Sequence, residues 1–421
     1  MEQELYELPE GWDWLFLREF AYIKGGKRLP KGEQLLDIKT AYPYVRVSDF
    51  NEKGSIDIDN LKYLSPSAYQ QIKNYTISSE DLYISIAGTI GKTGFLPYCL
   101  KQANLTENAA KIVLKYKNKQ KLKYIYYFTL SHHFLQQINI STKTVAQPKL
   151  ALVRLANIKI PLPSLSEQQR ITNKLDGMLG RIDQAITLLQ ENLDAQDALF
   201  ASLLQQAFDP LGRSGSKNEN LYELPAGWEW KKLSEICTVV SGTTPKTSVS
   251  EYWDGQFNWV TPAELNDSTI IVFETKRKIT EKAIHECSLK KMPKGTVLLS
   301  SRAPIGKVAI TGQEMYCNQG FKNLICSHLV FNKFLFYFLK GQTNYLNSLG
   351  KGTTFKEISK KIVENIYLPH PVIFNEQQRI ADKLDALAEK NEALKKTLQE
   401  KIDELNNLKS SILDAAFRGQ L

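Results

Sequence analysis

Apolar residues return every three or four positions along two long segments of the chain, at about 166–208 and about 375–417. This spacing puts them on one face of an α-helix, and when sustained over many turns it is typical of a coiled coil. The positions assigned to helix–helix packing are Ile171, Leu175, Met178, Ile182, Leu189, Ile380, Leu384, Leu387, Asn391, Leu394, Leu398 and Leu405. The alternative is two ordinary amphipathic helices on globular cores, but a run of about 40 residues is about 60 Å long, which favours the coiled coil.

Both segments begin with the same sequence. Glu167-Gln-Gln-Arg-Ile171 and Glu376-Gln-Gln-Arg-Ile380 are separated by 209 positions. Serine or asparagine before a helix, followed three residues later by glutamine, forms a capping box, so we predict helix starts at Ser166 and Asn375. Helices with matching starts and seams would pack most simply against each other.

The regions before the two helices also repeat. Leu5-Tyr-Glu-Leu-Pro-Glu-Gly-Trp-Asp-Trp14 returns as Leu221-Tyr-Glu-Leu-Pro-Ala-Gly-Trp-Glu-Trp230. The paired tryptophans of these openings are interpreted as core anchors. The stretch 209–220 is rich in Gly, Ser and Asn, which indicates a linker. The predicted order is therefore a domain at 1–163, a helix at 164–208, the linker, a domain at 221–371 and a helix at 372–421.

Short strand-like runs dominate the two repeated domains. Examples are 112–116 and 296–300, and helices are predicted at Lys121–Ile138 and Phe331–Leu349. The fold class we expect is α+β: two tandem mixed α/β domains, each followed by a long helix, with the two helices packed as an antiparallel coiled coil.

Charge is divided unevenly between these parts. The net charge is +9, but residues 1–160 and 211–375 each carry +7, whereas the two helical segments together carry −5. Basic domains on non-basic spacers suggest a polyanion bound at two places. The chain has no apolar run of membrane-spanning length, no signal-peptide pattern and no CxxC pair among its five cysteines, so we expect a cytoplasmic protein.

Motifs for chemistry are weak. Ala87-Gly-Thr-Ile-Gly-Lys-Thr93 resembles a phosphate loop, but Ile86 stands where its first glycine is required. The repeated Gly-Lys is interpreted as a tight turn that presents a lysine. Asp267, Glu274 and Lys276 have a nuclease-like spacing, which the first domain does not repeat. The five histidines show no metal-ligand pattern. We therefore expect no catalytic residues and no metal.

The whole chain resembles the specificity subunit of type I restriction–modification systems. The resemblance rests on the Leu-Pro-x-Gly-Trp-x-Trp openings, the Glu-Gln-x-x-Ile helix starts, the duplicated domain–helix order and the ending Ala415-Ala-Phe-Arg-Gly-Gln-Leu421. It implies that each domain recognises one half of a bipartite DNA target and that the helices set the spacer between the halves. It also implies two methyltransferase subunits and restriction subunits as partners, with S-adenosylmethionine, ATP and magnesium bound by those partners and no cofactor on this chain.

Candidate DNA-binding residues are basic and polar side chains in loops that recur in both domains. They are Lys24, Lys27, Arg28, Lys31, Arg46, Ser48, Lys92, Lys143, Thr144, Lys149, Lys246, Thr261, Glu264, Arg302, Lys307, Lys351, Thr353, Thr354 and Lys356. For any single lysine, a solvated surface position is an equally good interpretation. Two alternatives stay open: a nuclease that uses Asp267, Glu274 and Lys276, and a structural coiled-coil adaptor without DNA contact.

Overall fold

The structure, a computed structural model, describes residues 5–142, 149–208, 223–266, 269–302, 304–352 and 356–421. The chain divides into two compact units. The first comprises residues 1–189 and 400–421, and the second comprises residues 190–399. The predicted linker at 209–220 lies outside the described residues. No described helix combines the length and apolarity needed to cross a membrane.

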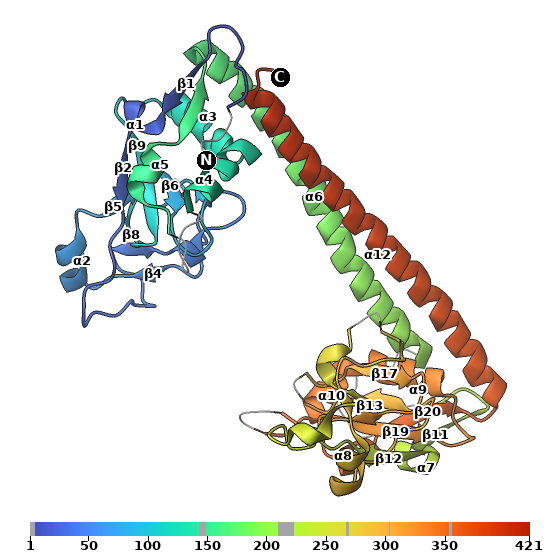
Figure 1. Cartoon of the computed structure of the whole chain (residues 1–421). Helices are drawn as coiled ribbons and strands as arrows, with labels where there is room; N and C mark the ends of the chain where they lie inside the picture. Colours follow the sequence, from blue (N-terminus) through green and yellow to red (C-terminus); the bar gives the residue numbers. More distant parts are fainter. Residues whose placement is uncertain (1–4, 143–148, 209–222, 267–268, 303, 353–355) are drawn as a thin grey trace. The chain divides into compact units, whose positions relative to one another are not determined.

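The first unit contains two four-stranded sheets, β2-β9-β6-β7 and β4-β3-β8-β5, and the antiparallel pair β1–β10 (Figure 1). Its strands are β1 (Asp13–Phe16), β2 (Ala21–Gly25), β3 (Pro43–Val45), β4 (Lys62–Tyr63), β5 (Thr76–Ser78), β6 (Leu82–Ser85), β7 (Thr93–Gly94), β8 (Gln102–Leu105), β9 (Ala109–Leu114) and β10 (Lys159–Leu162). Its short helices are α1 (Leu17–Phe20), η1 (Val47–Asp49), α2 (Pro66–Ile72), α3 (Lys119–Thr129), α4 (His132–Thr142) and α5 (Leu152–Ala156).

The second unit repeats this plan with a five-stranded sheet, β12-β19-β16-β17-β14, a three-stranded sheet, β15-β13-β18, and the pair β11–β20. Its strands are β11 (Trp228–Lys232), β12 (Cys237–Ser241), β13 (Trp253–Val260), β14 (Ile271–Val272), β15 (Lys278–Ile279), β16 (Val297–Leu299), β17 (Val308–Thr311), β18 (Tyr316–Cys317), β19 (Lys322–Cys326) and β20 (Tyr367–Pro371). Its short helices are α7 (Leu233–Ile236), η2 (Ser250–Tyr252), η3 (Pro262–Glu264), α8 (Glu281–Glu286), α9 (Asn332–Gly341), α10 (Thr343–Leu349) and α11 (Lys360–Glu364).

Two helices of 44 residues each, α6 (Leu165–Phe208) and α12 (Phe374–Phe417), confirm the predicted long helices. In the first unit, Leu175 and Ile182 of α6 share an apolar core with Ile412 and Phe417 of α12. In the second unit, Leu204 of α6 shares a core with Leu384 of α12. The beginning of each helix thus packs with the end of the other within a unit, so the pair is antiparallel, as predicted.

The helix starts differ from the prediction. Both helices begin two residues earlier than caps at Ser166 and Asn375 would require, so these two residues lie within the first turn. Ser164, not Ser166, accepts a hydrogen bond from the Glu167 N–H, at 3.4 Å. The repeated glutamine with a structural role is the second residue of the motif rather than the third. Gln168 and Gln377 are buried, and they donate to the carbonyls of Pro163 and Pro371.

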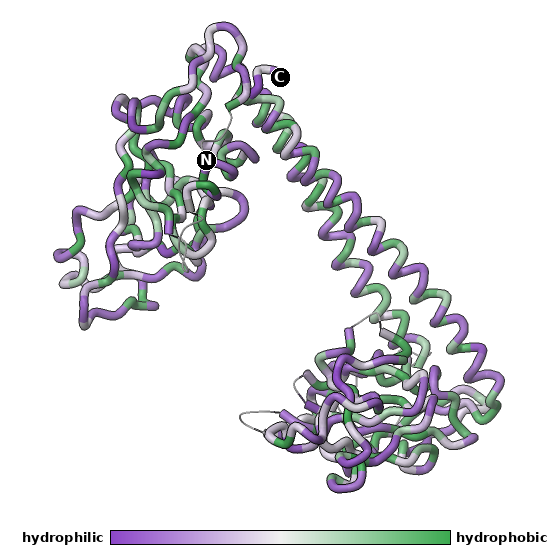
Figure 2. The backbone as a smooth tube through the Cα atoms, viewed as in Figure 1, coloured by the Kyte–Doolittle hydropathy of each residue, from purple (hydrophilic) through white to green (hydrophobic). Residues whose placement is uncertain are grey.

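The buried seam of the two helices also differs from the assigned positions. Ile171, Leu175, Ile182, Leu384 and Leu398 are buried, and Leu189, Ile380, Asn391 and Leu405 are half-buried. Met178, Leu387 and Leu394 are instead 39%, 38% and 41% exposed. The residue after Met178 or Leu387, namely Leu179 or Ala388, is buried in its place. Figure 2 shows this mixture of apolar and polar residues along both helices.

The strand-like runs at 112–116 and 296–300 overlap β9 and β16, as predicted. Each predicted single helix at 121–138 and 331–349 is instead two helices, α3–α4 and α9–α10. Ser131 explains the first break, because its hydroxyl accepts from the Phe134 N–H at 3.3 Å and donates to the Phe128 carbonyl at 2.7 Å. The opening tryptophans Trp12, Trp14 and Trp228 pack against the cores of their units, as anchors should.

The same polar contact ties each globular part to its long helix. In the first unit, Lys123 and Tyr127 of α3 both donate to the Asp176 carboxylate on α6. In the second unit, Lys333 and Tyr337 of α9 both donate to Asp385 on α12. Burial, and then the hydrogen bond to the aspartate, raise the pKa of both tyrosines. The duplication seen in the sequence is therefore a duplication of packing.

Candidate nucleic-acid interface

The loop after β2 carries Lys27 and Arg28 and is held against β8. A Cβ on Gly26 would lie 2.0 Å from the Thr106 carbonyl oxygen, so only glycine fits there. The Lys27 N–H donates to the Leu105 carbonyl at 2.8 Å, and the Tyr44 hydroxyl donates to the Lys27 carbonyl at 2.9 Å. The backbone of this loop is thus fixed at the edge where β3 and β8 end.

The loop after β12 is built in the same way. A Cβ on Gly242 would lie 1.9 Å from the Asn318 carbonyl oxygen. The Thr243 N–H donates to the Cys317 carbonyl at 2.9 Å, and the Trp259 indole N–H donates to the Thr243 carbonyl at 3.1 Å. Two different sequences therefore place a polar loop at the same position of the fold. We call it the glycine-led loop, because it begins with Gly26 in the first unit and Gly242 in the second.

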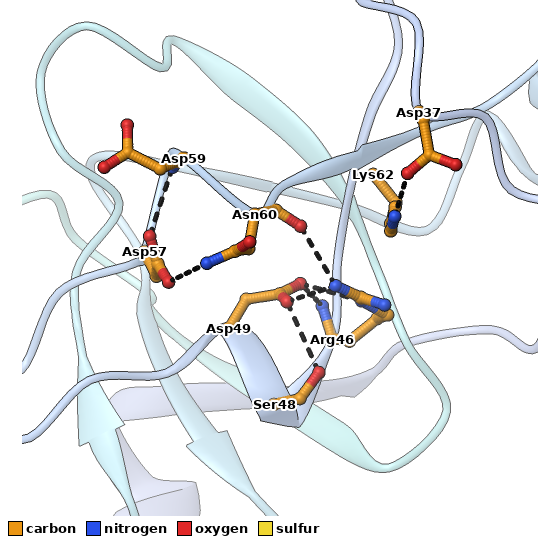
Figure 3. A network of polar contacts seen from close by, with 8 residues as sticks. All are labelled: Asp37, Arg46, Ser48, Asp49, Asp57, Asp59, Asn60 and Lys62. Carbon is orange, nitrogen blue, oxygen red and sulfur yellow. Dashed lines mark hydrogen bonds and ion pairs between the residues drawn. The ribbon is translucent and has the colours of Figure 1, made fainter. Parts of the chain in front are cut away.

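A short 3-10 turn, η1 or η3, follows the central strand beside each of these loops. In η1 the Arg46 guanidinium donates to both oxygens of Asp49, at 2.6 and 3.1 Å, and to the Asn60 carbonyl at 3.1 Å (Figure 3). Asp49 is buried, and the Ser48 hydroxyl also donates to it, at 3.3 Å. The candidates Arg46 and Ser48 are therefore held together by one buried carboxylate.

Glu264 performs this organising role in the second unit. Its carboxylate accepts from the Thr261 N–H at 2.8 Å and from the Lys276 N–H at 2.6 Å. It thereby joins η3 to the basic stretch Thr275–Lys278, which leads into β15. In this stretch the Arg277 guanidinium lies 3.7 Å from the centre of the Trp253 ring. Glu264 is a positioning residue in this geometry, and Arg277 is a surface cation that the sequence analysis missed.

The repeated Gly-Lys pairs form tight turns, as predicted, with φ of +94° at Gly91 and +95° at Gly306. The lysines after them are not simply presented to solvent. Lys307 Nζ donates to the carbonyls of Leu265 at 2.5 Å and Pro262 at 3.3 Å. Lys92 pairs with Glu52, which follows η1. In each unit the lysine of this turn therefore points toward the η turn, so these two turns and the glycine-led loop belong to one region of each unit.

The remaining candidates are more dispersed. Lys24 is on β2, opposite Lys111 of β9. Lys149 pairs with Ala87 in an isolated backbone β-bridge. Arg302 and Lys351 each form a backbone β-bridge of this kind with Glu357. Lys31, Lys246 and Lys356 are exposed. Lys143, Thr144, Thr353 and Thr354 lie outside the described residues.

The sequence did not predict which residues pair with the basic side chains of this region. Arg28 pairs with Glu107 at 2.7 Å, and the Lys27 ammonium lies 5.4 Å from the centre of the Tyr75 ring. In the second unit the buried Lys322 pairs with Glu357 at 3.1 Å. These partners are far away in sequence and carry no motif. Only Lys276-Arg277-Lys278, as a run of basic residues, offered a visible signal.

The nuclease-like spacing does not form a cluster among the described residues. Glu274 is exposed and accepts from Gln313 at 3.1 Å, and its pKa is lowered mainly by a hydrogen bond from Lys278. The backbone N–H of Lys276 donates to the Glu264 carboxylate, and Asp267 lies outside the described residues. Across the described parts of the chain, no group of three or more His, Cys, Asp or Glu is arranged to hold a metal ion.

Known proteins are similar to this chain in sequence and in fold. It is 40% identical over 190 residues to the type I restriction enzyme MjaIX specificity subunit of Methanocaldococcus jannaschii, a match that covers 43% of this chain and 44% of that protein. It is 25% identical over 429 residues to the putative MjaX specificity subunit of the same organism, covering 99% of this chain and 95% of that protein.

Two solved structures share the fold. A chain from the study titled "Structural basis underlying complex assembly and conformational transition of the type I R-M system" matches with a TM-score of 0.76 and 24% identity, covering 99% of this chain and 100% of that chain. The HsdS subunit from Thermoanaerobacter tengcongensis matches with a TM-score of 0.52 and 23% identity over 99% of both chains.

The family described as "Type I restriction modification DNA specificity domain" matches twice, at residues 9–194 and 225–404. Each match covers one globular part and the greater part of the long helix that follows it. Together the two matches take in most of the chain. The protein therefore belongs to the type I restriction–modification DNA specificity family.

Proposed function

We propose that this chain is the non-catalytic, DNA-reading subunit of a type I restriction–modification complex and that it recognises a bipartite sequence. The observation that carries this proposal is the recurrence, in both units, of a glycine-led polar loop beside an η turn and a Gly-Lys turn. Two readers built on one plan suit a target of two separate half-sites. The charge of +7 on each globular part favours the DNA backbone as the shared ligand.

Different candidates would have different roles on DNA. The exposed lysines, such as Lys31 and Lys246, would contact phosphates, which adds affinity but little sequence information. Arg46 is pre-oriented by the buried Asp49, and an arginine held in this way suits contact with a guanine edge. Ser48 on η1 and Thr261 directly before η3 would read base edges as polar side chains.

The partners follow from the same proposal. Two methyltransferase subunits and the restriction subunits would supply catalysis and would bind S-adenosylmethionine, ATP and magnesium, while this chain binds none of them. We propose recognition domains at 1–163 and 221–371, joined by a linker at 209–220, with the helices at 164–208 and 372–421 setting the spacer. A continuous helix of 44 residues is about 66 Å long, or roughly two turns of DNA. The site of action we propose is the cytoplasm.

Selection from a randomised duplex library tests this function, using the full chain together with modification subunits. We expect enrichment of two short conserved blocks separated by an unread spacer of fixed length. Enrichment of a single contiguous block, or of no sequence, would contradict the proposal. No binding of duplex DNA, even at low salt, would instead favour the structural adaptor.

A lysine variant sharpens the test. Lys27→Ala should weaken binding similarly across sequences and should reduce the slope of log affinity against log salt by about 1. The control is Lys174→Ala, which removes an exposed lysine from helix α6 and should leave both quantities unchanged. Equal effects of the two variants would show that Lys27 has no special role.

A further inference from the structure

Two cysteines lie opposite each other on neighbouring strands of the five-stranded sheet of the second unit. Cys237 begins β12 and Cys326 ends β19, and the antiparallel register of these strands makes them direct partners. Both thiols are free. A cysteine pair of this kind can be two small apolar residues of the core, or it can be a site of oxidation, and the geometry of the ladder distinguishes the two.

The two cysteines occupy a position of the ladder at which the Cα atoms of the two strands come close together. The Ser327 N–H donates to the Ile236 carbonyl at 2.9 Å, and the Gly242 N–H donates to the Phe321 carbonyl at 3.2 Å. Hydrogen-bonded and non-hydrogen-bonded pairs alternate in an antiparallel ladder, so Cys237 and Cys326 form a non-hydrogen-bonded pair. The Cα atoms of such a pair are about 4.5 Å apart, which is within the range that a disulfide can bridge.

The two thiols differ in access. Cys237 is buried in the core of the unit. Cys326 is half-buried and lines a cavity of about 350 Å³ together with Lys294, Phe331 and Asn332. A hydrogen bond with Cys326, reinforced by burial, raises the pKa of the Cys237 thiol. A small reagent would therefore reach Cys326 first. Cys237 lies beside it as a protonated thiol.

We propose that Cys237 and Cys326 form an oxidation site, at which hydrogen peroxide converts the two thiols into a cross-strand disulfide. The Cys326 sulfur attacks one peroxide oxygen, the O–O bond breaks, and one water leaves as Cys326 becomes a sulfenic acid. The Cys237 sulfur then attacks the Cys326 sulfur, the S–O bond breaks, and a second water leaves. The two thiols give up two electrons and two protons, and the peroxide is reduced.

The first unit offers an internal control. In its equivalent strands, β2 and β9, the matching pair is Ala21 and Leu114. This pair occupies the same ladder position, because the Lys115 N–H donates to the Phe20 carbonyl at 3.0 Å. The modification would therefore act on one unit only. It would join β12 to β19 at the first residue of β12, at the opposite end of this strand from the loop that begins at Gly242.

The experiment treats the full chain with hydrogen peroxide, blocks the remaining thiols, and maps the peptides by mass spectrometry without reduction. We expect a peptide that links Cys237 to Cys326, lighter by two hydrogen atoms than the sum of its parts, and its loss on reduction. Sulfinic acid at Cys326 with a free thiol at Cys237 would overturn the proposal. So would an unmodified pair under conditions that oxidise the exposed Cys99.

Variants and amide exchange test the mechanism. In Cys326→Ala, Cys237 should resist peroxide, whereas Cys99→Ala should leave the cross-link unchanged. Oxidation of Cys237 at its original rate in Cys326→Ala would refute the order of attack. In the oxidised wild-type chain, amides of β12 and β19 should exchange more slowly, while those of β2 and β9 should not change. Equal slowing in both pairs of strands would show that the effect is not this disulfide.

Discussion

His133 is an ionisable residue placed where its charge is disfavoured. Its ring lies 4.9 Å from the ring of Tyr6 and 5.2 Å from that of Trp14, measured between centroids. Burial in this aromatic setting lowers the pKa of His133 to about 4, and the positive charge of Arg418 adds to the effect. The neutral ring thus fits the first unit, and the protonated ring does not.

We predict that the first unit loses stability as the pH falls. Between an ordinary histidine pKa of about 6.5 and the folded value of about 4, the unfolded chain binds the proton and the folded chain does not. The stabilisation is therefore complete above about pH 6.5 and is lost progressively toward about pH 4. Urea unfolding at several pH values, followed by amide exchange in the first unit, measures this slope.

The matched control separates His133 from the carboxylates that also titrate in acid. His133→Phe keeps an aromatic ring without a proton and should flatten the pH dependence between about pH 4 and 6.5. An unchanged slope in His133→Phe would assign the acid sensitivity to other groups.

Individual side chains were the hardest feature to predict from the sequence. Arg46 and Lys307 were both identified as basic residues in repeated loops, but their partners were not. Arg46 binds Asp49 and the distant Asn60 carbonyl, and Lys307 donates to the carbonyls of Leu265 and Pro262. The contact of Arg46 with Asp49 is local, because the two residues are three positions apart. The contact of Arg46 with Asn60 and both contacts of Lys307 depend instead on segments that only the folded chain brings together.

At the level of elements, the two long helices show which buried positions of the seven-residue repeat can be predicted from the sequence. Alternate seam positions of α12, such as Leu384 and Leu398, were placed correctly by counting large apolar residues. Leu387 and Leu394 were placed one residue too early, because the more buried positions beside them are occupied by Ala388 and Lys395. Alanine gives a weak apolar signal, and a lysine can bury its methylene stem while its ammonium binds an acid. Lys395 does this with Asp197, at 2.7 Å.

Two leucines on α12 test this seam. Leu384 is 3% exposed in the core of the second unit, and Leu387 is 38% exposed. Leu384→Ala should lower the free energy of unfolding by about 2–5 kcal/mol, because it removes buried methyl groups and leaves a cavity. Leu387→Ala should cost less than about 1 kcal/mol, since little apolar area is lost there. Urea unfolding of both variants provides the comparison, and equal losses would contradict the seam described.

Element type was more predictable than element continuity. The two long helices, the strand runs and the division into repeats followed from periodicity, because each pattern extends over many residues. The breaks between α3 and α4 and between α9 and α10 did not. A single serine ends one pattern and starts the next, as at Ser131, and apolar spacing continues across the break. A periodic pattern therefore fixes where a helix can form, and a local cap decides where it stops.

For the whole molecule, the duplicated design extends to the ion pairs of the long helices. Within the first unit, Lys409 of α12 pairs with Asp183 of α6, and within the second, Lys395 pairs with Asp197. The two aspartates are two heptads apart on α6, and the two lysines are two heptads apart on α12. Whole heptads can therefore be removed between these pairs without disturbing either the pairs or the seam.

This spacing defines a test of the proposal that the helices set the spacer of the DNA target. One heptad would be deleted between Asp183 and Asp197, and one between Lys395 and Lys409. Each deletion shortens its helix by about 10 Å, which corresponds to about 3 base pairs. Library selection should then return the same two half-sites with a spacer about 3 base pairs shorter. Removing four residues from each helix instead would displace the seam and should weaken binding, because buried positions become polar. Changed half-sites with an unchanged spacer would refute the role of the helices as a ruler.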